Sequence, residues 1–350
     1  MPSAPTRLAS RRAALCSLAA ALAACQTAPP RPPPPVAPPA APPASASPPP
    51  GAAVGVASAP ANGGAATPAA APAAAAAPPP VASAGGAPRP PPRPPKIGLA
   101  LGGGAARGFA HIGAIQVLEE AGIRPDLVVG TSAGSLVAAL YASGRSGQEL
   151  AATALTMDEG AITDWAFPSR GVIRGEALAR YVREQTGGRT IEQMKLPLGI
   201  VATDLDSGAP VLFQRGDTGI AVRASSAVPA VFQPVKIGDR EYVDGGLVSP
   251  VPVRYARQMG AEMVIAIDIS SPPDGNPTGD SFKLLMQTVA IMMKSISRLE
   301  LREADFVLRP SLVGVNSADF NSRVRAIRAG REVAAQMLGE LKAKIAALSR

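Results

Sequence analysis

Apolar residues change their spacing along this chain at residue 96. Beyond that point, short uninterrupted apolar runs alternate with longer stretches in which apolar residues recur at helical spacing. The runs that predict buried strands are 97–101, 126–129, 198–205, 210–213, 263–269 and 304–310. Strands that are apolar throughout, with helices between several of them, need cover on both faces of their sheet. The pattern therefore predicts a three-layer α/β/α domain with a mostly parallel central sheet.

Helices are predicted where apolar residues fall on one face of a 3.6-residue period. The helical stretches are 106–122, 135–144, 282–303 and 318–348. The stretch 282–303 holds three methionines among leucines and isoleucines, and this composition favours core packing over a lid that grips lipid. The closing stretch, 318–348, is expected to cap the sheet or to pack as a C-terminal arm.

The first 95 residues have a different composition. They hold 27 of the 39 prolines, no Asp or Glu and no aromatic residue. Such a segment cannot bury enough apolar surface to offset the entropy lost on folding, so we predict a disordered Ala/Pro-rich tether over 26–95. The 255 residues from Lys96 onward have room for one large α/β domain.

Residues 1–25 have the features of an export signal. Arginines precede a short apolar stretch, 13–24, and the tetrapeptide that ends at Cys25 resembles the bacterial lipobox. That resemblance implies cleavage before Cys25, lipidation of its thiol, and a cell-envelope location; Gln26 in the next position implies the outer membrane, facing the periplasm. An ordinary signal peptide beside a cysteine is the alternative, and both Sec and twin-arginine export stay open. Cys16 would leave with the signal, so no disulfide forms within one mature chain.

Charge excludes one class of partner. The net charge of +8 is that of a basic protein, but six of the 34 Lys and Arg residues precede Lys96. The remaining part has 28 basic residues against 26 acidic ones. Such a small excess is not the electrostatic footprint of a nucleic-acid-binding protein.

The pentapeptide GTSAG, residues 130–134, follows the second predicted strand and precedes a helix. The pattern G-x-S-x-G in this context is typical of a nucleophile elbow, in which small flanking residues allow a sharp turn that exposes the Ser132 hydroxyl. The helix N-terminus beside it supplies unpaired N–H groups. A plain turn with a serine or threonine helix cap is the alternative.

A second glycine-rich turn, GGGAARG at 102–108, follows the first predicted strand. It lacks the third glycine of a dinucleotide-binding motif, since Arg107 stands there, and it lacks the G-K-[ST] ending of a P-loop. Successive backbone N–H groups can instead stabilise an oxyanion. A simple tight turn is the alternative.

A third segment, VDGGLVSPVPV at 243–253, contains an Asp-Gly pair that by itself favours a hairpin turn. Taken together in this order, however, the segments resemble the patatin-like phospholipase family over nearly all of residues 96–312. The motifs that carry the resemblance are GLALGGGAARGFAHIGAIQVLEEAGI, GTSAGSLVAALYASG, VATDLDSGAPVLFQRGD, VRASSAVPAVFQPV and VDGGLVSPVPV. The resemblance implies a catalytic domain over 96–312, followed by a helical extension over 313–350.

The same resemblance implies a Ser-Asp dyad with Ser132 as nucleophile and Asp244 as proton acceptor. It also implies an oxyanion hole that is formed by Gly102, Gly103, Gly104 and Ala105. Residues that the motifs keep in support are Arg107, Gly108, Gly130, Gly134, Gly245 and Gly246. Ala105 departs from the fullest form of the motif, which has another glycine there, and its methyl group disfavours a positive φ.

The other candidate acids and bases receive structural roles at this stage. His111 is the single histidine and precedes the serine, unlike the Ser-Asp-His order of α/β-hydrolases, so we predict that it is hydrogen-bonded into the core. Asp204 and Asp206 lie at a predicted strand end, where turn-forming roles are favoured over catalysis.

The implied activity is acyl transfer from a membrane lipid or another acyl ester, through an acyl-serine intermediate, as in a phospholipase, lysophospholipase or esterase. No metal cluster is visible in the sequence, and the mechanism needs no metal or cofactor. A catalytically quiet envelope lipoprotein that uses the fold for binding or tethering is the alternative, and a nucleotide-binding domain is disfavoured by the failed phosphate motifs. Acyl chain, headgroup, ester position, acceptor and oligomeric state stay open.

Overall fold

The computed structural model describes residues 93–165, 170–274, 278–315 and 319–349. The strands of the main sheet are β1 (Ile97–Leu101), β2 (Leu127–Thr131), β4 (Leu198–Asp204), β5 (Pro210–Phe213), β7 (Val235–Ile237), β8 (Arg240–Asp244), β9 (Met263–Ile267) and β10 (Phe306–Leu308). Their order is β10-β9-β1-β2-β4-β8-β7, with β5 also paired to β4. The five strands from β10 to β4 are parallel, whereas β5, β7 and β8 pair antiparallel. Each of the six predicted strand runs contains a strand.

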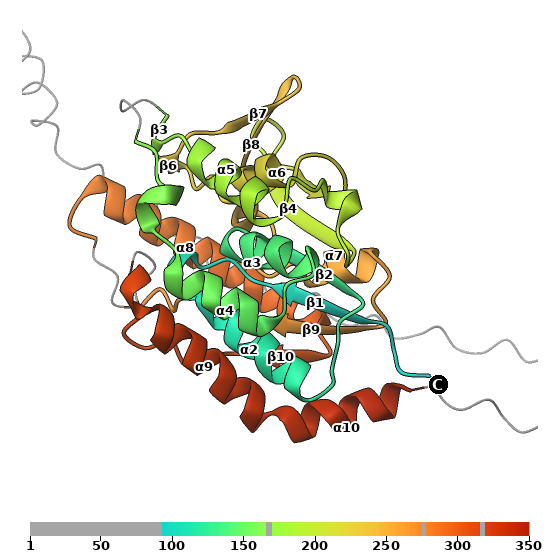
Figure 1. Cartoon of the computed structure of the whole chain (residues 1–350). Helices are drawn as coiled ribbons and strands as arrows, with labels where there is room; N and C mark the ends of the chain where they lie inside the picture. The colour runs from blue at the N-terminus through green and yellow to red at the C-terminus, as the bar shows by residue number, and fades with distance from the viewer. Residues whose placement is uncertain (1–92, 166–169, 275–277, 316–318, 350) are drawn as a thin grey trace, which may run out of the picture. The chain divides into compact units, whose positions relative to one another are not determined.

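The remaining elements connect or cover this sheet. Helices are α2 (Phe109–Glu120), α3 (Ala133–Ala142), α4 (Gly147–Thr156), α5 (Glu176–Gln185), α6 (Thr218–Ser225), α7 (Val253–Gln258), α8 (Ser281–Glu300), α9 (Arg323–Gln336) and α10 (Leu338–Leu348). Two short strands, β3 (Gly171–Ile173) and β6 (Ala230–Phe232), form a separate parallel pair. Short 3-10 helices include Ala105–Gly108, Gly245–Leu247 and Leu301–Glu303. Figure 1 shows the strands β9, β1, β2 and β4 one above the other across the middle of the domain, with the helices around them.

Two apolar cores lie on opposite faces of the sheet and establish the three-layer α/β/α arrangement. On one face, side chains such as Leu99 and Ile265 pack with residues of α2, α3, α4 and α9. On the other face, neighbours along the same strands, including Ala100 and Val264, pack with α7. This alternation follows from the two-residue period of a strand, and it explains why the runs are apolar throughout.

The C-terminal helices pack on the same core as the sheet. α9 crosses α2 where glycines remove the side chains: a Cβ on Gly113 would lie 1.9 Å from the carbonyl oxygen of Ile327, and a Cβ on Gly330 would lie 1.9 Å from that of Ala110. The two backbones are therefore in direct contact, as the red α9 beside α2 in Figure 1 shows. The segment predicted as one closing helix forms two helices. α9 ends at Gln336, Met337 caps it, and α10 begins at Leu338.

The structure corrects the prediction for the methionine-containing helix. In α8 just Ser297 and Glu300 are buried, so this helix is not part of the core. Its 3.6-residue apolar period arises because one face of the helix packs on the protein. The outer face also carries large apolar side chains, which are leucines, an isoleucine and a methionine. Among helices of the described ranges, none has both the length and the apolar character needed to cross a bilayer.

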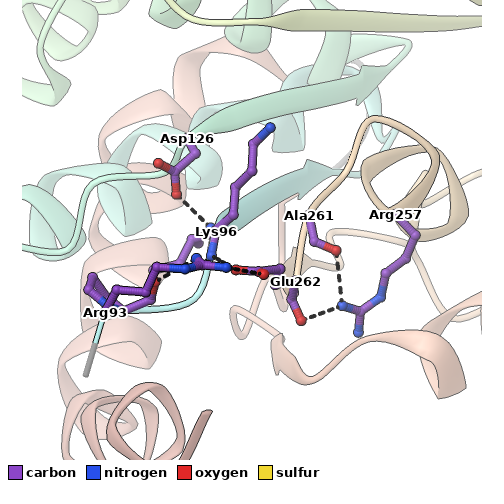
Figure 2. A network of polar contacts seen from close by, with 8 residues as sticks. Arg93, Lys96, Asp126, Arg257, Ala261 and Glu262 are labelled. Atoms are coloured by element: carbon purple, nitrogen blue, oxygen red, sulfur yellow. Dashed lines mark hydrogen bonds and ion pairs between the residues drawn. The ribbon is translucent and has the colours of Figure 1, made fainter. Parts of the chain in front are cut away.

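A polar network fixes the start of β1 between its two neighbours (Figure 2). The backbone N–H of Lys96 donates to Glu262 at 2.8 Å, and the N–H of Ile97 donates to Asp126 at 2.6 Å. Arg93 forms an ion pair with the same Glu262 carboxylate at 2.6 Å. Arg257 donates to the Glu262 carbonyl at 2.8 Å. These contacts hold β1 in register with β9 and β2, and they thereby set the position of the glycine-rich loop at its other end.

Candidate active site

The register of the sheet brings Ser132 and Asp244 together. Because β5 occupies one edge of the middle of β4, β2 and β8 share the other edge. β2 runs parallel to β4 and ends with Thr131 opposite Val201, whereas β8 runs antiparallel and ends with Asp244 opposite Ala202. The two strands therefore meet end to end. Ser132 follows Thr131 directly, so it faces Asp244 although the two are 112 positions apart.

The two side chains form a buried hydrogen-bonded pair. The Ser132 hydroxyl donates to Oδ2 of Asp244 at 2.7 Å, and the backbone N–H of Gly246 donates to Oδ1 at 2.7 Å. Ser132 is 9% exposed and Asp244 is 5% exposed. Burial raises the pKa of Asp244 to about 6, and the two hydrogen bonds limit this rise. The carboxylate is thus ionised at neutral pH and is a stronger base than an exposed aspartate.

The turn that carries Ser132 has the strained backbone of a nucleophile elbow. Ser132 has φ 52° and ψ −125°, in a region that non-glycine residues rarely adopt. A Cβ on Gly130 would lie 2.3 Å from the carbonyl oxygen of Gly134, and one on Gly134 would lie 2.2 Å from that of Leu101. The Ser132 side chain makes no helix-capping hydrogen bond, which removes the helix-cap alternative. Its backbone N–H is held by the Ser225 hydroxyl at 2.8 Å.

The glycine-rich loop lies against Ser132, but two of its four predicted oxyanion donors already donate to backbone carbonyls. A Cβ on Gly103 would lie 3.2 Å from Cβ of Ser132. The N–H of Gly102 donates to the Ile267 carbonyl at 3.1 Å, and that of Gly103 donates to the Pro250 carbonyl at 2.9 Å. The first continues the β1–β9 ladder beyond the strand. In this conformation these two amides hold the loop rather than a ligand.

Gly104 and Ala105 are the two predicted donors whose N–H groups have no acceptor among the described residues. Ala105 adopts φ 50°, the conformation that its methyl group was expected to disfavour. It also opens the 3-10 helix Ala105–Gly108, where a first-turn N–H has no partner within the helix. The oxyanion assignment therefore narrows to Gly104 and Ala105.

The supporting residues of these motifs are buried or in backbone contact. Burial lowers the pKa of Arg107 to about 10, and the charge of Asp268 opposes this shift, so the guanidinium stays cationic at neutral pH. A Cβ on Gly108 would lie 3.0 Å from Cβ of Ala133. Gly245 approaches β4 so closely that a Cβ would lie 2.2 Å from the Val201 carbonyl oxygen. These glycines let the loop, the elbow and the Asp244 turn meet at one point.

The predicted structural roles of the other candidates agree with their contacts. His111 is fully buried, and its Nε2 lies 2.8 Å from the Gly102 carbonyl oxygen. Burial lowers the pKa of His111 to about 4, so the ring is neutral and Nε2–H is the donor in this contact. Asp204 accepts hydrogen bonds from Ser207 and pairs with Arg240 at 2.8 Å, which holds its pKa well below the usual range. Asp206 lies exposed in the following turn. The hairpin alternative for Asp244 also fails, because a 3-10 helix follows β8.

A group of hydrogen bonds near Ser132 could not be predicted, because no pattern in the sequence indicates it. The Thr131 hydroxyl donates to the Ser249 carbonyl at 2.8 Å, and the Ser249 hydroxyl donates to Glu300. Burial raises the pKa of Glu300 to about 7. Glu300 therefore ties the end of α8 to the residue before the nucleophile.

Comparison with known proteins adds a family to this geometry. Residues 99–257 match the family model described as patatin-like phospholipase. An uncharacterized NTE family protein of Mycobacterium tuberculosis is 36% identical over 208 residues, which are 59% of this chain and 58% of that protein. Patatin-like phospholipase domain-containing protein 6 of Homo sapiens is 37% identical over 196 residues, which are 53% of this chain and 14% of that protein.

The matched part thus spans less than two thirds of these relatives. Among solved structures, VipD from Legionella pneumophila aligns with a TM-score of 0.49 at 15% identity, over 71% of this chain and 68% of that one.

Proposed function

This chain belongs to the patatin-like phospholipase family through residues 99–257, and from that premise we propose that it is a serine lipid acyl hydrolase with a Ser132–Asp244 dyad. Family membership supports lipid hydrolysis in general, and the carboxylic ester class and the dyad are the proposal. The observation that carries it is the 2.7 Å hydrogen bond from the Ser132 hydroxyl to Asp244, at a strained elbow beside unpaired amides. No imidazole is within this arrangement, because the ring of His111 is engaged with Gly102.

In the proposed reaction, Ser132 Oγ attacks the ester carbonyl carbon while its proton moves to Oδ2 of Asp244. The carbonyl oxygen becomes an oxyanion, which the N–H groups of Gly104 and Ala105 stabilise by about 3 kcal/mol for each donor. The proton then passes from Asp244 to the leaving alcohol oxygen, and an acyl-serine remains. Water attacks that acyl-serine with Asp244 again as the base, and a fatty acid is released.

Mass spectrometry of lipid products tests this function directly. Vesicles of mixed phosphatidylcholine, phosphatidylethanolamine and phosphatidylglycerol are incubated with the purified full chain or with Ser132→Ala. We expect the unsubstituted protein alone to release free fatty acid together with a matching lysophospholipid. It should also react with a fluorophosphonate probe. A protein that releases no fatty acid and takes up no probe would instead be a binding or tethering module.

We further propose that the enzyme is held at the bacterial outer membrane, facing the periplasm, by lipid on Cys25. Cys25, the export signal 1–25 and nearly all of the tether 26–95 lie outside the described residues, so sequence alone supports this proposal. Labelled palmitate is expected to enter the protein in cells, and Cys25→Ser is expected to abolish the label and release the protein from membrane fractions. Cys16→Ser is the matched control, and equal labelling of all three proteins would contradict lipidation at Cys25.

A further inference from the structure

The outer face of α8 is an apolar surface beside the candidate active site. Its large apolar side chains are about half exposed, between 49% and 61% of each residue. They are Phe282, Leu284, Leu285, Ile291, Met292 and Leu299. All but Phe282 fall on one side of the helix, because positions 284 and 291, 285 and 292, and 292 and 299 are each seven residues apart. A contiguous apolar stripe of this kind on a surface helix indicates an interaction site.

The opposite face of α8 fixes the helix next to the dyad. The Met293 side chain rests on Gly246, where an added Cβ would lie 2.6 Å from its Cε. Lys294 donates to the Ser270 hydroxyl at 3.2 Å, at the end of the strand segment whose Ile267 carbonyl holds the glycine loop. At the last turn, Glu300 binds Ser249. The stripe is therefore held at a defined position relative to the nucleophile.

Basic residues run along one side of the stripe. Lys283 and Arg298 are exposed and fifteen positions apart, about four helical turns, which places them along the same border of the stripe. Within α8, Glu300 is the single acidic residue, and it is directed inward, with 7% of the residue exposed. The N-cap residue Asp280 pairs with Lys283 at 2.9 Å, so Arg298 is the unpaired cation of this border among the described residues. An apolar stripe with a basic border is the arrangement of helices that lie in a membrane interface and contact anionic headgroups.

We propose that the outer face of α8 docks the enzyme onto an anionic lipid surface and brings that surface to the Ser132–Asp244 dyad. This inference rests on the proposed function, since a lipid acyl hydrolase must draw its substrate from such a surface. The charge of the α8 surface indicates which kind of partner it binds. A second copy of α8 would set basic rows against each other, and the chain's own first 92 residues contain basic residues but no acidic ones. An anionic headgroup layer complements the basic row, and its acyl chains receive the apolar stripe.

Vesicle binding tests the proposal separately from catalysis. The full chain carries Cys25→Ser throughout, so that no lipid anchor contributes, and Ser132→Ala, so that vesicles stay intact. Sedimentation compares vesicles of phosphatidylglycerol and phosphatidylcholine in equal parts with vesicles of phosphatidylcholine alone. The apolar variant is Leu284→Gln, Ile291→Gln and Met292→Gln, and the charge variant is Lys283→Gln with Arg298→Gln. The matched control, Leu155→Gln with Val324→Gln, removes equally exposed apolar residues elsewhere.

We expect the apolar variant to bind both vesicles about 10-fold or more weakly, because three side chains lose their burial in lipid. The charge variant should lose binding to the anionic vesicles, by about 10-fold, and the control should bind as the parent does. In an active background, the apolar variant should keep its rate on a soluble short-chain ester and lose it on vesicles.

Three results would overturn docking through α8. The first is equal vesicle binding by the apolar variant and the parent. The second is a change of oligomeric state in the apolar variant without a change in vesicle binding, which would assign the stripe to a second copy. The third is an equal loss of the apolar variant's hydrolysis rate on the soluble ester and on vesicles, which would make α8 a structural support for the dyad. Absence of hydrolysis by every protein would contradict the proposed function and leave the binding result standing.

Discussion

Replacing Ser132 by alanine is expected to lower kcat for a soluble ester by about 10^4-fold or more, because the other hydroxyl of the elbow, on Thr131, donates to the Ser249 carbonyl instead of to Asp244. The fold should persist. The residue is 9% exposed, its side chain forms one hydrogen bond, to Asp244, and alanine keeps the backbone strain at φ 52° unchanged. The measurement is hydrolysis of a p-nitrophenyl ester, with labelling by a fluorophosphonate probe as the second readout.

The control for this experiment is Ser143→Ala, which removes a buried hydroxyl at the end of the same helix, α3. It should retain both ester hydrolysis and probe labelling. Unchanged labelling of Ser132→Ala would show that the probe reacts elsewhere, and the nucleophile assignment would then be lost.

The Asp244→Asn variant is expected to lose about 10^3-fold in kcat and to gain stability at high pH. Activity falls because an amide cannot accept the Ser132 proton. Stability rises because the pKa of Asp244 is about 6 in the folded protein, against the ordinary aspartate value of 3.8 in the unfolded chain. Folding therefore favours the protonated form of Asp244. The stabilisation of the folded protein that results is fully present below the unfolded pKa of 3.8, and it is lost as the pH rises through 6. At pH above 7 the buried charge costs up to about 3 kcal/mol, which asparagine avoids.

Urea denaturation checks the stability part, with an expected gain of about 1–2 kcal/mol well above pH 6 and no gain below about pH 4. The kinetic counterpart is the unsubstituted enzyme, whose kcat/KM should fall about tenfold per pH unit below about pH 6 as Asp244 becomes protonated. Asp204→Asn supplies the contrast, since the pKa of Asp204 is lowered by Arg240 and Ser207, and this variant should lose stability at neutral pH. An activity profile that stays flat well below pH 6 would exclude Asp244 as the base.

Local patterns were sufficient to predict some of this molecule. Six of the strands, the elbow at 130–134 and the glycine-rich turn at 102–108 each follow from short-range composition, because strand burial and tight turns restrict neighbouring residues. The pairing of Ser132 with Asp244 was accessible through family resemblance alone. Its physical cause, two strands ending one residue apart along β4, is a register that no stretch of sequence encodes locally.

Other features could not be predicted from the sequence, for different physical reasons. A helical apolar period describes a core helix and a surface helix equally well. The period of α8 therefore predicts core packing, although its apolar stripe is exposed. The engagement of two predicted oxyanion donors, Gly102 and Gly103, could not be predicted, since the carbonyls of Ile267 and Pro250 that accept from them come from distant segments. At the break, the residue that follows the C-cap Met337 is Leu338, in place of the glycine that commonly ends a helix.

The position of β9 sets a lower limit on how short this protein can be made. The match to the family model ends at residue 257, yet β1 lies between β2 and β9, and β9 begins at Met263. A gene that ended with this match would lack β9 and β10, and the strand that precedes the glycine loop would be bare along one side. The smallest self-sufficient fragment must extend at least through β10, to Leu308.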